Sequence, residues 1–129
     1  MSKKKLTITE LIKNKEKITK GKPKTRDLYV DELDGVITIE KPERSLVVES
    51  IELAEDDNYD GNGDEFLVYN IVVDPDLKDP ELQKAYECVE PTDIVKKIFD
   101  PGTITSIAQE GMKLAGYTSK VTPVDDLKN

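Results

Sequence analysis

Two β-prone runs on either side of Asp34-Gly35 constrain the fold of this chain more than any other feature. Residues 28–33 and 36–40 are rich in β-branched and aromatic side chains. An Asp-Gly pair between such runs is typical of a β-hairpin, because a type I′ turn needs positive φ at both central residues. The sequence therefore predicts a hairpin with a two-residue turn at Asp34-Gly35, and Pro42 ends its second strand.

Apolar residues at helical spacing follow the predicted hairpin. Leu46, Val47 and Ile51 indicate a helix over about residues 43–55, with glutamates on its other faces. Residues 66–73 are apolar almost throughout, so hydrophobic periodicity does not distinguish a helix from a strand here. Their β-branched content favours a strand, while continuous apolarity also suits a buried helix.

Helix start and stop signals divide the distal part of the chain. Asp79-Pro80 and Asp100-Pro101 each place an N-cap residue before a proline suited to the first helical turn. Pro91-Thr92-Asp93 opens another predicted helix between them. Gly116 supplies a left-handed C-cap to the longest helix, which begins at Pro101.

The first 26 residues differ sharply in composition from the rest. They carry ten basic side chains against two acidic ones, a net charge of +8, while the remainder has nine against 25, a net charge of −16. A capping box from Thr7 to Glu10 opens a short amphipathic helix that ends before Gly21. The apolar residues of this helix are Ile8, Leu11, Ile12 and Ile18.

The charge pattern predicts three segments. We expect residues 1–25 to form a Lys-rich arm with a short helix, residues 26–120 a globular domain, and residues 121–129 a C-terminal tail. The arm is either a solvated mobile segment or one that docks on an acidic surface, its own or a partner's. Nucleic acid is not an expected partner, because no aromatic residue interleaves the lysines and the acidic remainder would repel phosphate.

The composition lacks what most catalytic and metal sites use. There is no His, which removes the commonest proton shuttle and the imidazole ligands of zinc and iron sites. Cys88 has no second cysteine and no imidazole to activate it, so we expect a partly buried, inert thiol. We therefore expect no enzymatic activity, no cofactor, and no catalytic or metal-binding residues. No apolar run is long enough to span a bilayer, so we expect a cytoplasmic protein with no membrane partner.

One acidic loop matches the first part of a calcium-binding loop. Residues 56–64 place oxygen-bearing side chains at alternate positions, with Gly61 where a calcium loop turns sharply. Leu67 stands where the bidentate carboxylate of the twelfth position belongs, and Gly63 where an apolar residue is usual. We expect a solvated turn, and a weak calcium-responsive adaptor remains an alternative.

Several short segments follow one another in a fixed order through the distal half of the chain. They are Phe66-Leu67-Val68-Tyr69, residues 79–86, Pro91-Thr92-Asp93-Ile94-Val95, Phe99-Asp100-Pro101-Gly102, Ala115-Gly116-Tyr117 and Leu127-Lys128-Asn129. In the order of these segments, the distal half resembles the XkdN-like family of phage tail assembly chaperones. Residues 26–30, at the entry to the hairpin, also resemble the family, while the acidic loop and the Lys-rich start depart from it.

The resemblance implies both a fold and a function. It implies an α+β fold in a small single domain, with an N-terminal β-hairpin packed on a mainly helical C-terminal part, and it favours a helix over residues 64–73. It also implies a non-enzymatic chaperone that binds the tape measure protein, and other tail proteins, in the cytoplasm of the bacterial host. A structural tail component is the other alternative.

We expect the apolar stripe of the helix that begins at Pro101 to contact the client or to mediate self-association. Its candidate partner-binding residues are Ile104, Ile107, Gly111 and Met112. Gly111 stands where Ala would favour the helix by roughly 1 kcal/mol, so either close approach of another backbone or simple tolerance explains it.

Chaperones of this kind often occur in two lengths through ribosomal frameshifting. Codons for Leu127-Lys128-Asn129 permit a slippery heptamer, and the gene sequence would decide between a slip and an ordinary flexible terminus.

Overall fold

The computed structural model describes residues 4–20, 24–58, 62–118 and 121–127. The chain divides into two units, one made of residues 1–23 and 119–129 and the other of residues 24–118. We call residues 4–20 the arm and residues 24–118 the body. Lys128 and Asn129, where the frameshift expectation falls, lie outside the described residues.

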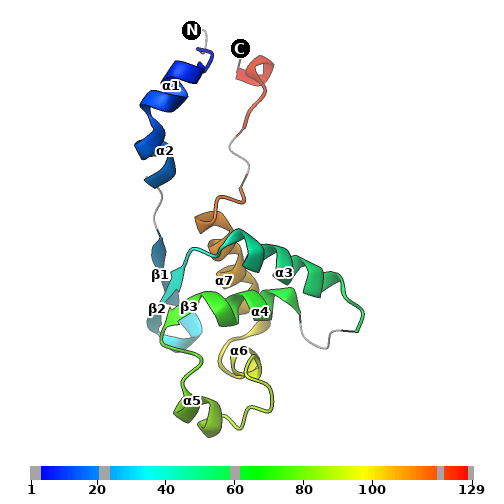
Figure 1. Cartoon of the computed structure of the whole chain (residues 1–129). Coiled ribbons are helices and arrows are strands. Elements are labelled where there is room, and N and C mark those ends of the chain that lie inside the picture. Colours follow the sequence, from blue (N-terminus) through cyan, green and yellow to red (C-terminus); the bar gives the residue numbers. More distant parts are fainter. Residues whose placement is uncertain (1–3, 21–23, 59–61, 119–120, 128–129) are drawn as a thin grey trace. The chain divides into compact units, whose positions relative to one another are not determined.

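The described part of the body contains a three-stranded antiparallel sheet (Figure 1). Strand β1, Thr25–Val30, pairs with β2, Gly35–Glu40, in a register that places Thr25 opposite Glu40. Strand β3, Val72–Asp74, pairs with the other edge of β2. With several helices around this sheet, the predicted α+β class is confirmed.

The turn between β1 and β2 differs from the predicted one. The first strand ends at Val30, and Asp31–Leu33 forms a 3-10 turn. Asp34 follows in the left-handed region, with φ 48° and ψ 50°, and Gly35 already begins β2 without a positive φ. The two-residue Asp34-Gly35 turn was therefore wrong. The longer turn needs only one residue in the left-handed region. Asp34 takes that position, one residue before Gly35, because aspartate tolerates this region better than most residues.

Of the five helices in the described part of the body, the last three along the chain begin at the predicted start signals. Asp79 accepts hydrogen bonds from the amides of Glu81 and Leu82, as an N-cap residue should. Gly116 has φ 88° just after the last helix, as predicted for a left-handed C-cap residue. The helices are α3 (Arg44–Glu55), α4 (Gly63–Ile71), α5 (Pro80–Ala85), α6 (Asp93–Ile98) and α7 (Pro101–Leu114).

The ambiguous apolar run divides between a helix and a strand. The chain is helical to Ile71, and Val72 then pairs with Ile39 of β2. The helical prediction for residues 64–73 was thus correct for most of the run and wrong at its β-branched end. Ile71 and Val68 are fully buried, and α4 contacts α3, α6 and α7. The run is apolar throughout because α4 is covered on several sides.

The core of the body lies where α4, α6 and α7 meet the sheet. Buried apolar side chains from these elements form one continuous cluster, which also includes Leu77 from the loop before α5. The most deeply buried of the large side chains are Ile39, Val47, Val68, Ile71, Leu77, Ile94 and Val95.

The arm forms two short helices rather than the single helix predicted. Helix α1 is Ile8–Lys13 and helix α2 is Lys15–Lys20, and Asn14 separates them. Thr7 accepts a hydrogen bond from the amide of Glu10, which is one half of the predicted capping box. In the other unit-1 segment, Val124–Leu127 forms a 3-10 turn.

Candidate functional site: a groove between β1 and α7

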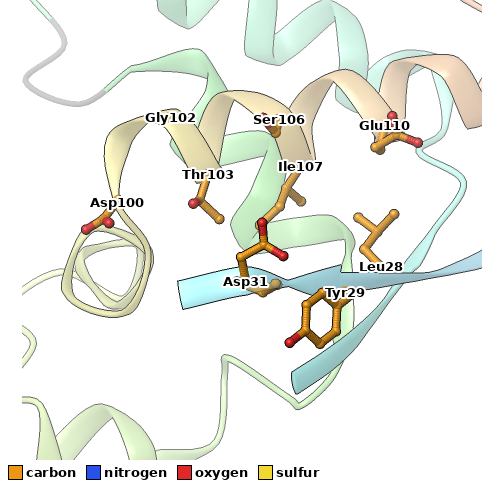
Figure 2. Close-up of a pocket in the computed structure, with 10 residues that line it drawn as sticks. Leu28, Tyr29, Asp31, Asp100, Gly102, Thr103, Ser106, Ile107 and Glu110 are labelled. Carbon is orange, nitrogen blue, oxygen red and sulfur yellow. The ribbon is translucent and has the colours of Figure 1, made fainter. Parts of the chain in front are cut away.

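A groove of about 640 Å³ runs between β1, with the 3-10 turn that follows it, and helix α7. Figure 2 shows the side chains of Leu28 and Asp31 extending toward the helix. Leu28 and Ile107 give the groove an apolar interior, and carboxylates stand along it. The residues that line it are Leu28, Tyr29, Val30, Asp31, Asp100, Gly102, Thr103, Ser106, Ile107 and Glu110.

The apolar stripe predicted to bind a partner faces mainly into the core. Ile104 and Ile107 are 5% and 3% exposed, Gly111 is buried, and Met112 is half-buried. A Cβ at Gly111 would lie 2.5 Å from Cδ1 of Ile71, so the close neighbour is a side chain rather than another backbone. Of these four residues, Ile107 also lines the groove. Contact of the stripe with a partner stays a prediction.

Glu32 connects the turn after β1 to the start of α7. Its carboxylate accepts hydrogen bonds from the backbone N–H of Asp100, with both oxygens 3.3 Å from that nitrogen. The side chain of Asp100, which the sequence predicted to cap α7, makes no capping hydrogen bond. The sequence analysis did not predict this contact of Glu32. Glu32 lies 68 residues before Asp100, beyond the reach of local capping rules.

The same contact shifts the acidity of both carboxyl groups. A hydrogen bond with Thr103, and then one with Asp100, lowers the pKa of Glu32. The pKa of Asp100 is raised, first by its side-chain hydrogen bond with Glu32 and then by the negative charge of Glu32. The second carboxyl group is therefore harder to ionise beside the first, as expected for like charges. This end of the groove consequently favours a cation or a shared proton.

Polar contacts fix two further groove residues. The Tyr29 hydroxyl donates to a carboxylate oxygen of Asp34, and this hydrogen bond raises the pKa of the phenol. At the other end, Arg26 contacts Glu110 with 3.4 Å between nitrogen and oxygen, and Lys113 contacts the second oxygen of Glu110 at 3.2 Å. These contacts are partly exposed, so they orient the side chains more than they stabilise the fold.

The calcium-like loop has structural roles at both ends. Residues 59–61, its centre, lie outside the described residues. Asp56 accepts a hydrogen bond from the amide of Asn58, and Asn62 caps α4 by accepting from the amide of Glu65. Burial raises the pKa of Asp64, which disfavours its ionised form. Within the described residues, no group of three or more Cys, Asp or Glu side chains could hold a metal ion.

Gly63 and Leu67 depart from the calcium pattern for reasons of packing. An ideal Cβ at Gly63 would lie 2.1 Å from the carbonyl oxygen of Ser50, so glycine lets the start of α4 approach α3. Leu67 occupies the twelfth position because it is a core residue, 2% exposed.

The model of the phage XkdN-like tail assembly chaperone family matches residues 43–128. That region holds 86 of the 129 residues, including α3 to α7 and the α7 wall of the groove. A search of the curated proteins and a search of the solved structures found no match. Since the family model covers more than half of the chain, the protein belongs to the XkdN-like family of phage tail assembly chaperones.

Proposed function

We propose that this protein is a non-enzymatic tail assembly chaperone that binds the tape measure protein in the host cytoplasm and leaves before the tail is complete. The family match over residues 43–128 carries the proposal. Contacts with other tail proteins are part of it. Among the described residues, no helix has the length and apolarity needed to cross a bilayer.

The groove between β1 and α7 is the surface that we propose for the client. A chaperone of a long helical protein must cover apolar side chains while keeping the complex in solution, and amphipathic helices commonly bind in grooves. Leu28 and Ile107 offer apolar contact inside the groove. Asp31 and Asp100 add charge that opposes aggregation.

The proposed client surface still lies on α7. It is the face of α7 that lines the groove, rather than the apolar stripe that faces the core. Ile107→Lys would place a charge at a position that is 3% exposed, so this variant reports on folding rather than on binding. Ser106 lines the groove and is exposed. It is therefore the better position for a binding test.

The experiment is co-expression with the tape measure protein of the same phage, followed by affinity purification of the chaperone. We expect the wild-type chain to raise the soluble yield of the tape measure protein and to co-purify with it. Ser106→Arg should reduce co-purification at least about tenfold, which corresponds to about 1.4 kcal/mol of binding free energy. Gln109→Arg, an exposed α7 position that does not line the groove, is the matched control and should bind as the wild type does.

Three outcomes separate the parts of the proposal. No effect of the wild-type chain on the tape measure protein would overturn the function. Equal binding by both Arg variants would keep the function and remove the groove. Stoichiometric presence of the chain in purified tails would favour the structural tail component instead.

A further inference from the structure

The arm presents apolar side chains that its own two short helices leave uncovered. Helices α1 and α2 contain no buried residue among the described positions. Leu6, Ile8 and Ile12 are 71%, 77% and 69% exposed. Ile8, Leu11 and Ile12 have the spacing of one helical face, so they form a short apolar stripe. Contiguous exposed apolar side chains on a small protein mark an interaction surface more often than chance solvent exposure.

The same segment is strongly basic. Lysines flank the apolar stripe, and the first 26 residues carry a net charge of +8 against −16 for the rest of the chain. The family match begins at residue 43, so it does not account for the arm. The described lysines of the arm are Lys4, Lys5, Lys13, Lys15, Lys17 and Lys20.

The groove between β1 and α7 has the complementary chemistry. Its interior offers the apolar side chains of Leu28 and Ile107, and Asp31 and Asp100 line it with negative charge, whereas Glu110 is already paired with Arg26 and Lys113. Glu32 stands beside Asp100 and raises its pKa, so a lysine ammonium there would relieve repulsion between two carboxylates. An occupant that combines apolar residues with several lysines fits both features of the groove.

We propose that the groove binds the N-terminal arm of a second copy of this chain. A second copy is the proposed occupant because opposite charges of this size attract the arm of one copy to the body of another. Reciprocal exchange of arms gives a closed symmetric dimer, whereas one-way docking gives an open chain of copies. This self-association goes beyond the proposed function and needs no client, and a client that binds in the same groove displaces the arm.

The test uses the purified full-length protein without any other component. Sedimentation velocity is measured in about 50 mM and about 500 mM salt, because exposed charges are screened over about 14 Å in the first and about 4 Å in the second. We expect the wild-type chain to associate at low salt and to dissociate largely at high salt.

Two variants separate the two sides of the contact. The arm variant combines Lys13→Glu and Lys17→Glu, and the groove variant combines Asp31→Lys and Ser106→Lys. All four positions are exposed, so neither variant disturbs the core, and circular dichroism confirms folding. Each variant alone should be monomeric at low salt. Their equimolar mixture should associate again, because the lysine arm of the groove variant meets the unchanged acidic groove of the arm variant.

A matched control changes the same number of charges elsewhere. Lys84→Glu with Lys96→Glu alters exposed residues on α5 and α6 that do not line the groove, and this variant should associate at low salt. A monomeric wild-type chain at low salt overturns the proposal, including the case in which the arm binds its own body. The proposal is also overturned if the mixture fails to associate, or if the control variant loses association at low salt as fully as the arm variant does.

Discussion

The arm and the body both contain helices, yet they differ in what holds those helices in place. In the body, Ile71 of α4 and Val95 of α6 are fully buried and belong to one core cluster. In the arm, Ile8 and Ile12 of α1 remain largely exposed. Helices as short as α1 are marginal in water without packing on one face. Local signals thus suffice to begin a helix in either region, and in the body long-range apolar contacts also stabilise it.

The polar contacts show the same difference. Side-chain contacts described in the arm join close neighbours, such as Thr7 with Glu10 and Lys4 with Glu10. In the body, Glu32 accepts from the amide of Asp100 across 68 residues, and Arg26 contacts Glu110 across 84. The body is therefore a cooperative unit in which a local change should affect the whole. The arm should tolerate changes with little effect on unfolding.

The largest expected effect comes from truncating one isoleucine in each region. Ile71→Ala removes a fully buried side chain and should lower the free energy of unfolding by about 2–5 kcal/mol. Ile8→Ala removes a side chain that is 77% exposed and should change it by less than about 0.5 kcal/mol. Urea unfolding in high salt, where self-association is screened, measures both. A comparable loss in Ile8→Ala would show that the arm packs on an apolar surface within one copy.

A pair of glycines tests how closely the body elements pack. Gly63→Ala should lower the free energy of unfolding by about 1–3 kcal/mol, because its Cβ would lie 2.1 Å from a backbone oxygen of α3 that cannot move alone. Gly102→Ala is the control in the first turn of α7. Its Cβ would meet nothing within 4 Å, so it should raise the stability by about 0.4–1 kcal/mol. Thermal unfolding of both variants gives the comparison, and equal effects of the two would contradict the close approach of α4 to α3.

Local sequence rules predicted much of the fold because many of its boundaries are set by neighbouring residues. The Asp79 cap and the left-handed Gly116 each depend on residues within a few positions, and α7 begins at Pro101 because proline suits the first turn of a helix. The periodic apolar residues likewise placed α3 within a residue of its observed start at Arg44.

The remaining features depend on contacts that sequence periodicity does not contain. The Asp34-Gly35 pair suits a two-residue turn, but the sheet uses a longer one that allows Glu32 to reach α7. Gly63 matched a metal motif although its role is close packing on α3. The groove itself joins β1 with a helix about 70 residues later, so sequence analysis could propose α7 for partner binding but could not predict the strand beside it.

The smallest expected effect concerns the acidic pair that ties the β1–β2 connection to α7. The folded pKa of Glu32 is lowered, so its stabilising contribution is present above its unfolded pKa and is lost as pH falls through the folded value. The folded pKa of Asp100 is raised, so its contribution is present below its unfolded pKa and is lost as pH rises through the folded value. At neutral pH the ionised Asp100 therefore opposes folding, while the ionised Glu32 supports it.

Asp100→Asn should accordingly raise the melting temperature slightly at pH 7, because the amide removes the repulsion from Glu32 and leaves the backbone contact intact. The difference from wild type should shrink as the pH falls through the acid range, where Asp100 becomes protonated and neutral like the amide. Glu32→Gln should lower the melting temperature at pH 7, and the double variant should deviate from the sum of the two because the groups interact directly.

Loss of the negative charge at the N-terminus of α7 opposes the gain in Asp100→Asn through the helix dipole. We expect the interaction with Glu32 to outweigh this attraction, because its hydrogen bond and its charge raise the pKa of Asp100. A melting temperature that Asp100→Asn lowers at pH 7, by an amount that shrinks as Asp100 becomes protonated in acid, would show that the helix dipole dominates instead.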